Sequence, residues 1–135
     1  MEKRQTATFI PYKILDDEYY FFVQLRSKDA AVRPGWFGLW GGGIKGEETP
    51  EEGLVREVKE ELNIDISEYT FLDIFETEFA TVSAFYAEVD ENFEDSITVL
   101  EGQYGKFFTL SEIQSLESMT DDVKEILSHL HEDLN

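Results

Sequence analysis

The chain has 135 residues, and its 30 aspartates and glutamates against 11 lysines and arginines give a formal net charge of −19. This charge disfavours nucleic acid polymers and anionic membranes as general electrostatic partners, because their phosphates would be repelled. With 41% hydrophobic residues the chain can still form a folded core, so the charge does not indicate a disordered acidic tail. The absence of cysteine excludes disulfides, cysteine zinc ligands and a thiol nucleophile.

The length, and the lack of a linker or internal repeat, predict a single domain over residues 1–135. Residues 1–8 lack the apolar core of a signal peptide, and no apolar run reaches the roughly 20 residues of a membrane span. We therefore expect a soluble, cytoplasmic protein.

The first third of the chain predicts β-structure. Residues 6–15 and 19–25 are rich in aromatic and β-branched side chains, and the polar residues 16–18 between them predict a hairpin. Residues 27–35 are polar and end in Arg-Pro-Gly, which is typical of a loop. A short apolar stretch then leads to three consecutive glycines at 41–43.

The clearest helix signal begins at Thr49. Thr49-Pro50-Glu51-Glu52 is a capping box with proline in the first helical position, and Asn63 accepts the left-handed conformation of a helix end. The predicted helix has an apolar face made of Leu54, Val55, Val58 and Leu62. An adjoining face carries Glu57, Glu60 and Glu61. Glu52 and Arg56 are four residues apart, the spacing of a helical ion pair.

The rest of the chain predicts further strands at 71–75, 81–89 and 106–110. A C-terminal amphipathic helix follows, because apolar residues recur at helical spacing in Val123, Ile126, Leu127, Leu130 and Leu134. Strands before and after a central helix predict an α/β (α+β) fold, in which helices pack on a mixed β-sheet.

The glutamate face allows two interpretations, because a charged stripe is usually a solvated surface. Here, however, like charges at i, i+3 and i+4 repel by about 0.2–0.5 kcal/mol per pair, and they border the apolar face. Clustered carboxylate oxygens are what Mg²⁺ or Mn²⁺ coordination requires. The glycines at 41–43 leave bare backbone for a ligand to approach. We therefore favour a metal site.

The same region resembles the Nudix family, whose signature is G-x5-E-x7-R-E-U-x-E-E-x-G-U, with U aliphatic. The matching residues are Gly42, Glu48, Arg56, Glu57, Val58, Glu60, Glu61 and Ile64. The single departure is Asn63, which replaces glycine and is expected to keep the turn. Residues 38–40, 101–103 and 107–108 are similar to less specific features of the family outside the signature. The resemblance implies the Nudix fold, a mixed β-sheet between α-helices, over essentially the whole chain.

The resemblance also implies hydrolysis of a nucleoside diphosphate linked to another moiety, with Mg²⁺ or Mn²⁺ as cofactor. It assigns metal binding to Glu57, Glu60, Glu61 and a backbone carbonyl near Gly42. Arg56 corresponds to the arginine that orients the glutamates of the family signature. The positions placed close to the metals and the substrate are Gly41, Gly43 and Glu48. A carboxylate would take the proton of the attacking water, and the candidates are Glu57, Glu60 and the later Glu101. For Glu101 the alternative is an ordinary turn acid.

Two further residues could contact a substrate. Arg26 follows an apolar strand, and it could bind phosphate or form a surface ion pair. Trp36 could stack on a base, whereas Trp40 is expected in the core. His129 and His131 are two residues apart, which does not place them on one helix face.

The substrate remains open among small nucleotides. No proline follows Pro50 and no tyrosine lies at 79–82, which disfavours two subgroups, the ADP-ribose and diadenosine polyphosphate hydrolases. The small size favours a pyrophosphohydrolase that converts a (d)NTP to NMP and pyrophosphate. Hydrolysis of a nucleotide-sugar or other conjugate, a non-catalytic nucleotide-sensing Nudix module and an acid-rich structural protein are the alternatives. Relatives are often homodimers, although this sequence carries no interface pattern.

Overall fold

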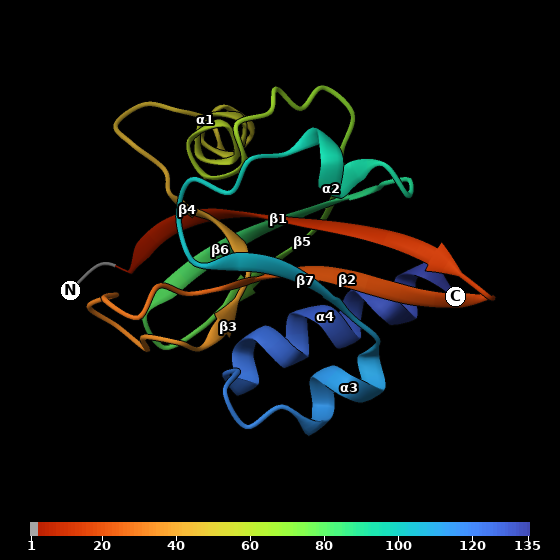
Figure 1. Ribbon diagram of the computed structural model, residues 1–135. Helices are drawn as coiled ribbons and strands as arrows, with labels where there is room; N and C mark the ends of the chain where they lie inside the picture. Colours follow the sequence, from red (N-terminus) through yellow and green to blue (C-terminus); the bar gives the residue numbers. More distant parts are fainter. Residues whose placement is uncertain (1–2) are drawn as a thin grey trace.

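The computed structural model describes residues 3–135, and it has a mixed β-sheet with helices on both faces (Figure 1). The central strand β1 (Arg4–Leu15) is antiparallel to β2 (Glu18–Leu25) and parallel to β6 (Ala80–Glu88). Outside β6 lies the antiparallel strand β5 (Thr70–Glu76). The α+β class and the mixed sheet predicted from the sequence are confirmed.

Three shorter strands complete the sheet. The β3 strand (Phe37–Gly38) and β7 (Tyr104–Phe108) both pair with β2, while β4 (Trp40–Gly43) pairs with β1. The predicted strand at 106–110 is therefore shifted by two residues. It ends earlier because Thr109 caps the next helix, where its side chain accepts a hydrogen bond from the Glu112 amide.

The predicted hairpin between β1 and β2 has a two-residue turn. Asp16 and Asp17 have φ angles of 51° and 63°, both in the left-handed region, while Glu18 already belongs to β2. Two consecutive positive φ angles are the requirement of a type I′ turn, which matches the twist of the flanking strands. Short polar side chains such as aspartate adopt this conformation more readily than bulky ones.

The helices cover opposite faces of the sheet. On one face lie α1 (Pro50–Leu62) and the short α2 (Phe93–Ser96), and on the other α3 (Leu110–Ser115) and α4 (Asp121–Leu134) (Figure 1). The predicted central helix is confirmed with its capping box and with Asn63 at φ 57°. The short helices α2 and α3 were not predicted. No helix in residues 3–135 is both long and apolar enough to cross a membrane.

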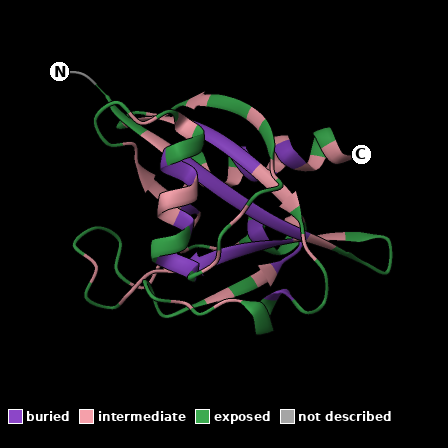
Figure 2. Ribbon diagram, turned by 90° about the horizontal axis from the view of Figure 1, so that it is seen from above, coloured by how far each residue is buried: buried purple, intermediate pink, exposed green. Residues whose placement is uncertain are grey.

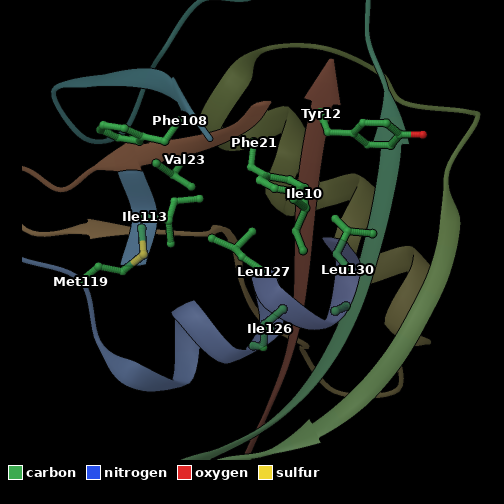
Figure 3. Close-up of a cluster of buried hydrophobic side chains, with 11 residues drawn as sticks. Ile10, Tyr12, Phe21, Val23, Phe108, Ile113, Met119, Ile126, Leu127 and Leu130 are labelled. Carbon is green, nitrogen blue, oxygen red and sulfur yellow. The ribbon is translucent and has the colours of Figure 1, made fainter. Parts of the chain in front are cut away.

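Two hydrophobic clusters hold these layers together. Under α1, the buried core consists of Ala7, Phe9, Phe22, Trp40, Leu54, Val58, Leu62, Phe85 and Phe93. On the other face, α4 inserts Ile126, Leu127 and Leu130 among side chains of β1 and β2 (Figure 3). The central strands are consequently buried along much of their length (Figure 2). They form a rigid platform on which α1 and β4 are placed.

The glycines at 41–43 form strand β4, which the sequence analysis treated only as bare backbone. Thr8 pairs with Gly41 and Thr6 with Gly43 across the β1–β4 ladder. Gly41 has φ 123°, and a Cβ atom there would collide with the carbonyl of Ala7. Glycine is therefore required for β4 to approach β1. This pairing fixes the glycine backbone beside α1.

Candidate active site

Glu61 is the most deeply buried acid of α1. It is 4% exposed, and its Oε1 accepts a hydrogen bond from the Gly41 amide at 2.7 Å. Burial raises the pKa of Glu61 from 4.5 to about 8, and the charges of Glu57, Glu101 and Glu60 add to this increase, although the Gly41 amide opposes it. No lysine or arginine in residues 3–135 forms an ion pair with Glu61. A bound cation would stabilise the charged form of its carboxylate.

Arg56 joins the acidic side chains around α1 into one hydrogen-bond network. Its Nε and Nη2 donate to the two carboxylate oxygens of Glu48 at 2.8 and 2.9 Å, a bidentate pair. Nη2 also donates to the carbonyl of Gly43 at 2.8 Å. Nη1 reaches Glu57 at 3.0 Å and Glu60 at 3.4 Å. Arg56 therefore contacts two acids of α1 and the backbone of β4 at the same time.

The expected ion pair between Glu52 and Arg56 was wrong. The Glu52 carboxylate instead accepts from the backbone amide of Thr49 at 2.9 Å, as the second half of the capping box. Arg56 is drawn to Glu48, which lies outside the helix and is also bound by the Lys45 amide at 2.8 Å. These hydrogen bonds, above all that from Arg56, lower the pKa of Glu48 to about 2.

Glu57 lies directly against the glycine strand. A Cβ atom built on Gly42 would be 2.7 Å from the Glu57 carboxyl carbon, so any side chain at Gly42 would displace this carboxylate. Glu60 differs, because its side chain is 43% exposed and its hydrogen-bond contact is the long one to Arg56. Glu57 and Glu61 therefore face the glycine backbone, while Glu60 lies nearer to solvent.

A cleft of about 490 Å³ opens between α1, β4 and the loops that follow β2 and precede β7. It is lined by Arg4, Gln24, Arg26, Ser27, Ala30, Leu39, Gly41, Gly42, Glu57, Glu61, Glu101 and Gly102. The cleft thus brings together six of the predicted site residues from four separate parts of the sequence. The other predicted residues, Arg56, Glu48, Glu60, Gly43 and Trp36, do not line it.

Glu101 is brought to the cleft by contacts of its backbone. The side chain of Gln24 donates to the Glu101 carbonyl at 3.0 Å, and the Gln103 amide donates to the carbonyl of Leu25 at 2.8 Å. Between them, Gly102 has φ 88°, and a Cβ atom there would be 2.8 Å from the same Leu25 carbonyl. The loop before β7 is therefore held on the end of β2, which places the Glu101 carboxylate near Glu61.

Arg26 and Trp36 have different surroundings. Arg26 lines the cleft, and its Nε donates to the Val32 carbonyl at 2.9 Å, which leaves its terminal nitrogens available. Trp36 is half-buried and lies 5.7 Å from the Arg33 guanidinium. Trp40 is fully buried and stacks on Phe22, which confirms its assignment to the core.

Sequence reasoning missed several residues of the cleft, and Arg4 and Gln24 are the two among them with long polar side chains. Gln24 could have been found, since it precedes Arg26 by two residues and a strand places such residues on one face. No sequence pattern around Arg4 indicates a binding site. It reaches the site because β1 pairs with β4, a contact between residues almost forty positions apart.

A second cleft of about 630 Å³ adjoins the first and is more apolar in its lining residues. These are Arg4, Arg26, Val32, Arg33, Phe37, Gly38, Leu39, Phe79, Thr120 and Val123. Arg4, Arg26 and Leu39 line both clefts, so the two arginines lie where the clefts meet. The combined surface has acids at one end, arginines in the middle and apolar side chains at the other end.

The residues present fit a hard divalent cation. The carboxylates of Glu57 and Glu61 and the backbone of β4 supply oxygen atoms only, which suits Mg²⁺ or Mn²⁺. Within residues 3–135, no three acidic or histidine side chains converge into a finished metal cluster. Arg56 instead binds oxygens of Glu57 and Glu60, so these side chains would have to turn toward the metal. The buried Glu61 carboxylate is the observation that favours a cation here.

Comparison with known proteins identifies the family. A family model described as the NUDIX domain matches residues 3–130. A segment of 45 residues is 42% identical to an 8-oxo-dGTP diphosphatase of Proteus vulgaris. That segment covers 31% of this chain and 40% of the relative, so the match spans less than half of that protein.

Solved structures show the same fold at low sequence identity. The NUDIX domain of Shewanella oneidensis NrtR, complexed with ADP ribose, has a TM-score of 0.79 at 14% identity, covering 100% of this chain and 90% of that one. A Caenorhabditis elegans Ap4A hydrolase has a TM-score of 0.74 at 18% identity and 97% coverage of both chains. A MutT protein of Methanosarcina mazei Go1 has a TM-score of 0.72 at 19% identity, covering 100% and 99%. With the family model spanning nearly its whole length, the chain belongs to the Nudix family.

Proposed function

We propose that this protein is a metal-dependent hydrolase that cleaves a diphosphate linkage in a small nucleotide. One observation carries the proposal: Glu57 and Glu61 face the glycine strand in a cleft that also contains Arg4 and Arg26. Carboxylates at one end could hold Mg²⁺ or Mn²⁺, and arginines at the other could hold the phosphates that the cation does not neutralise. Together they bring an anionic substrate into a protein of net charge −19.

The bound cation would neutralise phosphate oxygens and lower the pKa of a bound water. The chain's own residues then have distinct tasks. Arg56 holds Glu48 and the Gly43 carbonyl in place, while Glu57 and Glu60 would turn from Arg56 to the metal. The Gly41 amide orients the Glu61 carboxylate. A site held by such contacts is prepared before the substrate enters, which is how fixed charges contribute to catalysis.

The proton of the attacking water would pass to a carboxylate oxygen of Glu57 or Glu101. Both residues line the cleft, whereas Glu60, the third candidate, does not. The geometry therefore favours Glu57 and Glu101 over Glu60 as the proton acceptor. Glu101 comes from a segment other than α1, the loop before β7, which is held by the hydrogen bond from Gln24 to the Glu101 carbonyl.

The substrate we favour is a (d)NTP, which would give NMP and pyrophosphate. This choice is supported by the segment shared with an 8-oxo-dGTP diphosphatase. A nucleotide conjugate is the second candidate, because similar folds occur in a NUDIX domain complexed with ADP ribose and in an Ap4A hydrolase. The adjoining apolar cleft has room for a base or for another attached group in either case.

A substrate panel tests this proposal. Purified protein with Mg²⁺ or Mn²⁺ is incubated with nucleoside triphosphates, including 8-oxo-dGTP, and with ADP-ribose, Ap4A and nucleotide-sugars, and the products are separated. We expect release of NMP and pyrophosphate from at least one triphosphate. Turnover of conjugates alone would move the activity to the second candidate, and no turnover with any compound would refute hydrolysis.

The rival function is a nucleotide-sensing module without catalysis. It would be favoured if a panel compound bound tightly in calorimetry but was recovered unchanged after long incubation with metal. The charged residues of the Nudix signature are all present in this chain, which favours the enzyme over this rival.

A further inference from the structure

Two arginines line the cleft of a chain in which acids outnumber bases by 30 to 11. Within residues 3–135, the lysines and arginines that form ion pairs are Lys3, Arg56 and Lys59. Arg4 and Arg26 have no carboxylate partner among the described residues, although both line a cleft that contains Glu57, Glu61 and Glu101. Their charge is therefore available to an anion that enters the cleft.

Arg4 is the freer of the two. Arg26 uses its Nε to bind the Val32 carbonyl, whereas no side-chain hydrogen bond of Arg4 is formed with residues 3–135. The guanidinium of Arg4 lies over Gly43, where a Cβ atom would be 3.0 Å from its Nη2 and 3.1 Å from its Nε. The missing side chain of Gly43 thus makes the space in which Arg4 lies.

The position of Arg4 is set on both sides by β-structure. Its backbone begins β1, where its amide donates to the Phe79 carbonyl at 3.3 Å, and the neighbouring strand contributes Gly43. On its other side, Gly43 accepts from Arg56 through its carbonyl. The Arg56 guanidinium is occupied by hydrogen bonds to acidic side chains. The Arg4 guanidinium, which also lies beside Gly43, lines both clefts.

We propose that Arg4 binds a phosphate of the substrate, next to the phosphate that a cation bound by the α1 carboxylates would hold. Arg4 would then be a specificity residue that selects compounds with at least two linked phosphates over monophosphates. The Arg4 guanidinium is a planar fork of donors without a carboxylate partner in the described chain, and it lies between the acidic and the apolar cleft. The assignment rests on the proposed function, because it takes the substrate to be a diphosphate-linked nucleotide.

Calorimetric titration with inorganic pyrophosphate and with orthophosphate, both in Mg²⁺, tests Arg4 without any turnover. We expect Arg4→Gln to weaken pyrophosphate binding about tenfold or more, the loss expected for a charge-assisted hydrogen bond, and to change orthophosphate binding less than about twofold. Arg4→Lys should recover only part of the affinity, because lysine lacks the fork. The matched control is Lys3→Gln. It removes one positive charge at the neighbouring residue, whose side chain is paired with Glu76.

A double-mutant cycle with Gly43→Ala separates a specific role from a general charge effect. The added methyl group should displace the Arg4 guanidinium and weaken pyrophosphate binding in the wild-type background. In the Arg4→Gln background it should have a clearly smaller effect. Equal effects in both backgrounds would show that Arg4 does not bind the phosphate.

The results distinguish this inference from the proposed function. If the wild type binds pyrophosphate in an Arg4-dependent way but hydrolyses no nucleotide, Arg4 is supported and catalysis is refuted. If the wild type hydrolyses nucleotides while Arg4→Gln matches Lys3→Gln in every titration, Arg4 is refuted and catalysis stands. Equal weakening of orthophosphate and pyrophosphate, or no binding of pyrophosphate by the wild type, would also overturn the assignment to a second phosphate.

Discussion

Helices α1 and α4 have the same task in packing and different tasks in chemistry. They contain 13 and 14 residues, and each is preceded by an N-cap threonine whose side chain accepts a backbone hydrogen bond. Each buries apolar side chains against one face of the sheet, namely Leu54, Val58 and Leu62 in α1 and Ile126, Leu127 and Leu130 in α4. Only α1 also buries a carboxylate, Glu61, and directs Glu57 into a cleft.

The comparison teaches that a helix can supply a core and a reactive surface at once. In α1 the apolar and acidic faces adjoin, so packing of Leu54 and Val58 carries Glu57 and Glu61 to the glycine strand. In α4 the side chains buried against the sheet, Ile126, Leu127 and Leu130, are all apolar. Substitutions of the buried residues of α4 should therefore act mainly on stability, while substitutions on the acidic face of α1 should act mainly on activity.

The largest effect on stability is expected from Leu127→Ala in α4. Leu127 is fully buried, and truncation of a buried leucine costs about 2–5 kcal/mol of unfolding free energy. Urea unfolding would measure the loss, and hydrolysis well below the melting temperature should stay close to wild type. A strong loss of turnover in the folded variant would break the division between the two helices.

On the acidic face of α1, Glu57→Gln and Glu61→Gln should each lower kcat by about 100-fold or more, since each removes a metal-binding charge. Circular dichroism should show wild-type helix content. Glu52→Gln, in the same helix but away from the cleft, is the matched control and should retain activity. Wild-type turnover in both cleft variants would refute the assignment.

Glu61 should also make stability depend on pH when metal is removed by chelation. Its pKa is raised from 4.5 to about 8 in the folded state, so between these values the native protein holds a proton that the unfolded chain has lost. Unfolding free energy should therefore fall as pH rises from about 4.5 to about 8. In Glu61→Gln this decrease should be smaller. Parallel urea titrations at pH 5 and pH 8 would measure it, and identical decreases would contradict the burial argument.

The smallest effect is expected at the end of α1. Asn63 has φ 57° at the position where the family signature has glycine. Asn63→Gly should change the unfolding free energy by less than about 1 kcal/mol, because relief of left-handed strain is opposed by the added freedom of the unfolded chain. Thermal unfolding and turnover are both informative here, and a large fall in kcat would mean that this turn contributes to the site.

Local signals predicted α1 well, and long-range pairing explains what they missed. The capping box, the apolar face and Asn63 are all read from neighbouring residues, and the structure has each of them. The hydrogen bonds between Arg56 and Glu48, in contrast, depend on how the loop before α1 folds back onto the helix, which neighbouring residues do not indicate. The same holds for Arg4 and Gln24, which enter the cleft only through strand pairing. Short helices such as α3 have too few residues to show a period.

The division between Glu57, Glu60 and Glu61 could not be predicted from spacing either. All three lie on one side of the helix, yet Glu61 is 4% exposed and the Glu60 side chain 43% exposed. The difference arises because β4 covers only the part of α1 that faces Gly41 and Gly42.

Titration of the metal-free protein with Mn²⁺, followed by calorimetry, tests the central claim most directly. The account predicts saturable binding by the wild type and by Glu52→Gln, and loss of most of that binding in the double variant Glu57→Gln with Glu61→Gln. Binding of equal strength in the double variant, or no saturable binding in the wild type, would contradict a metal site between α1 and the glycine strand.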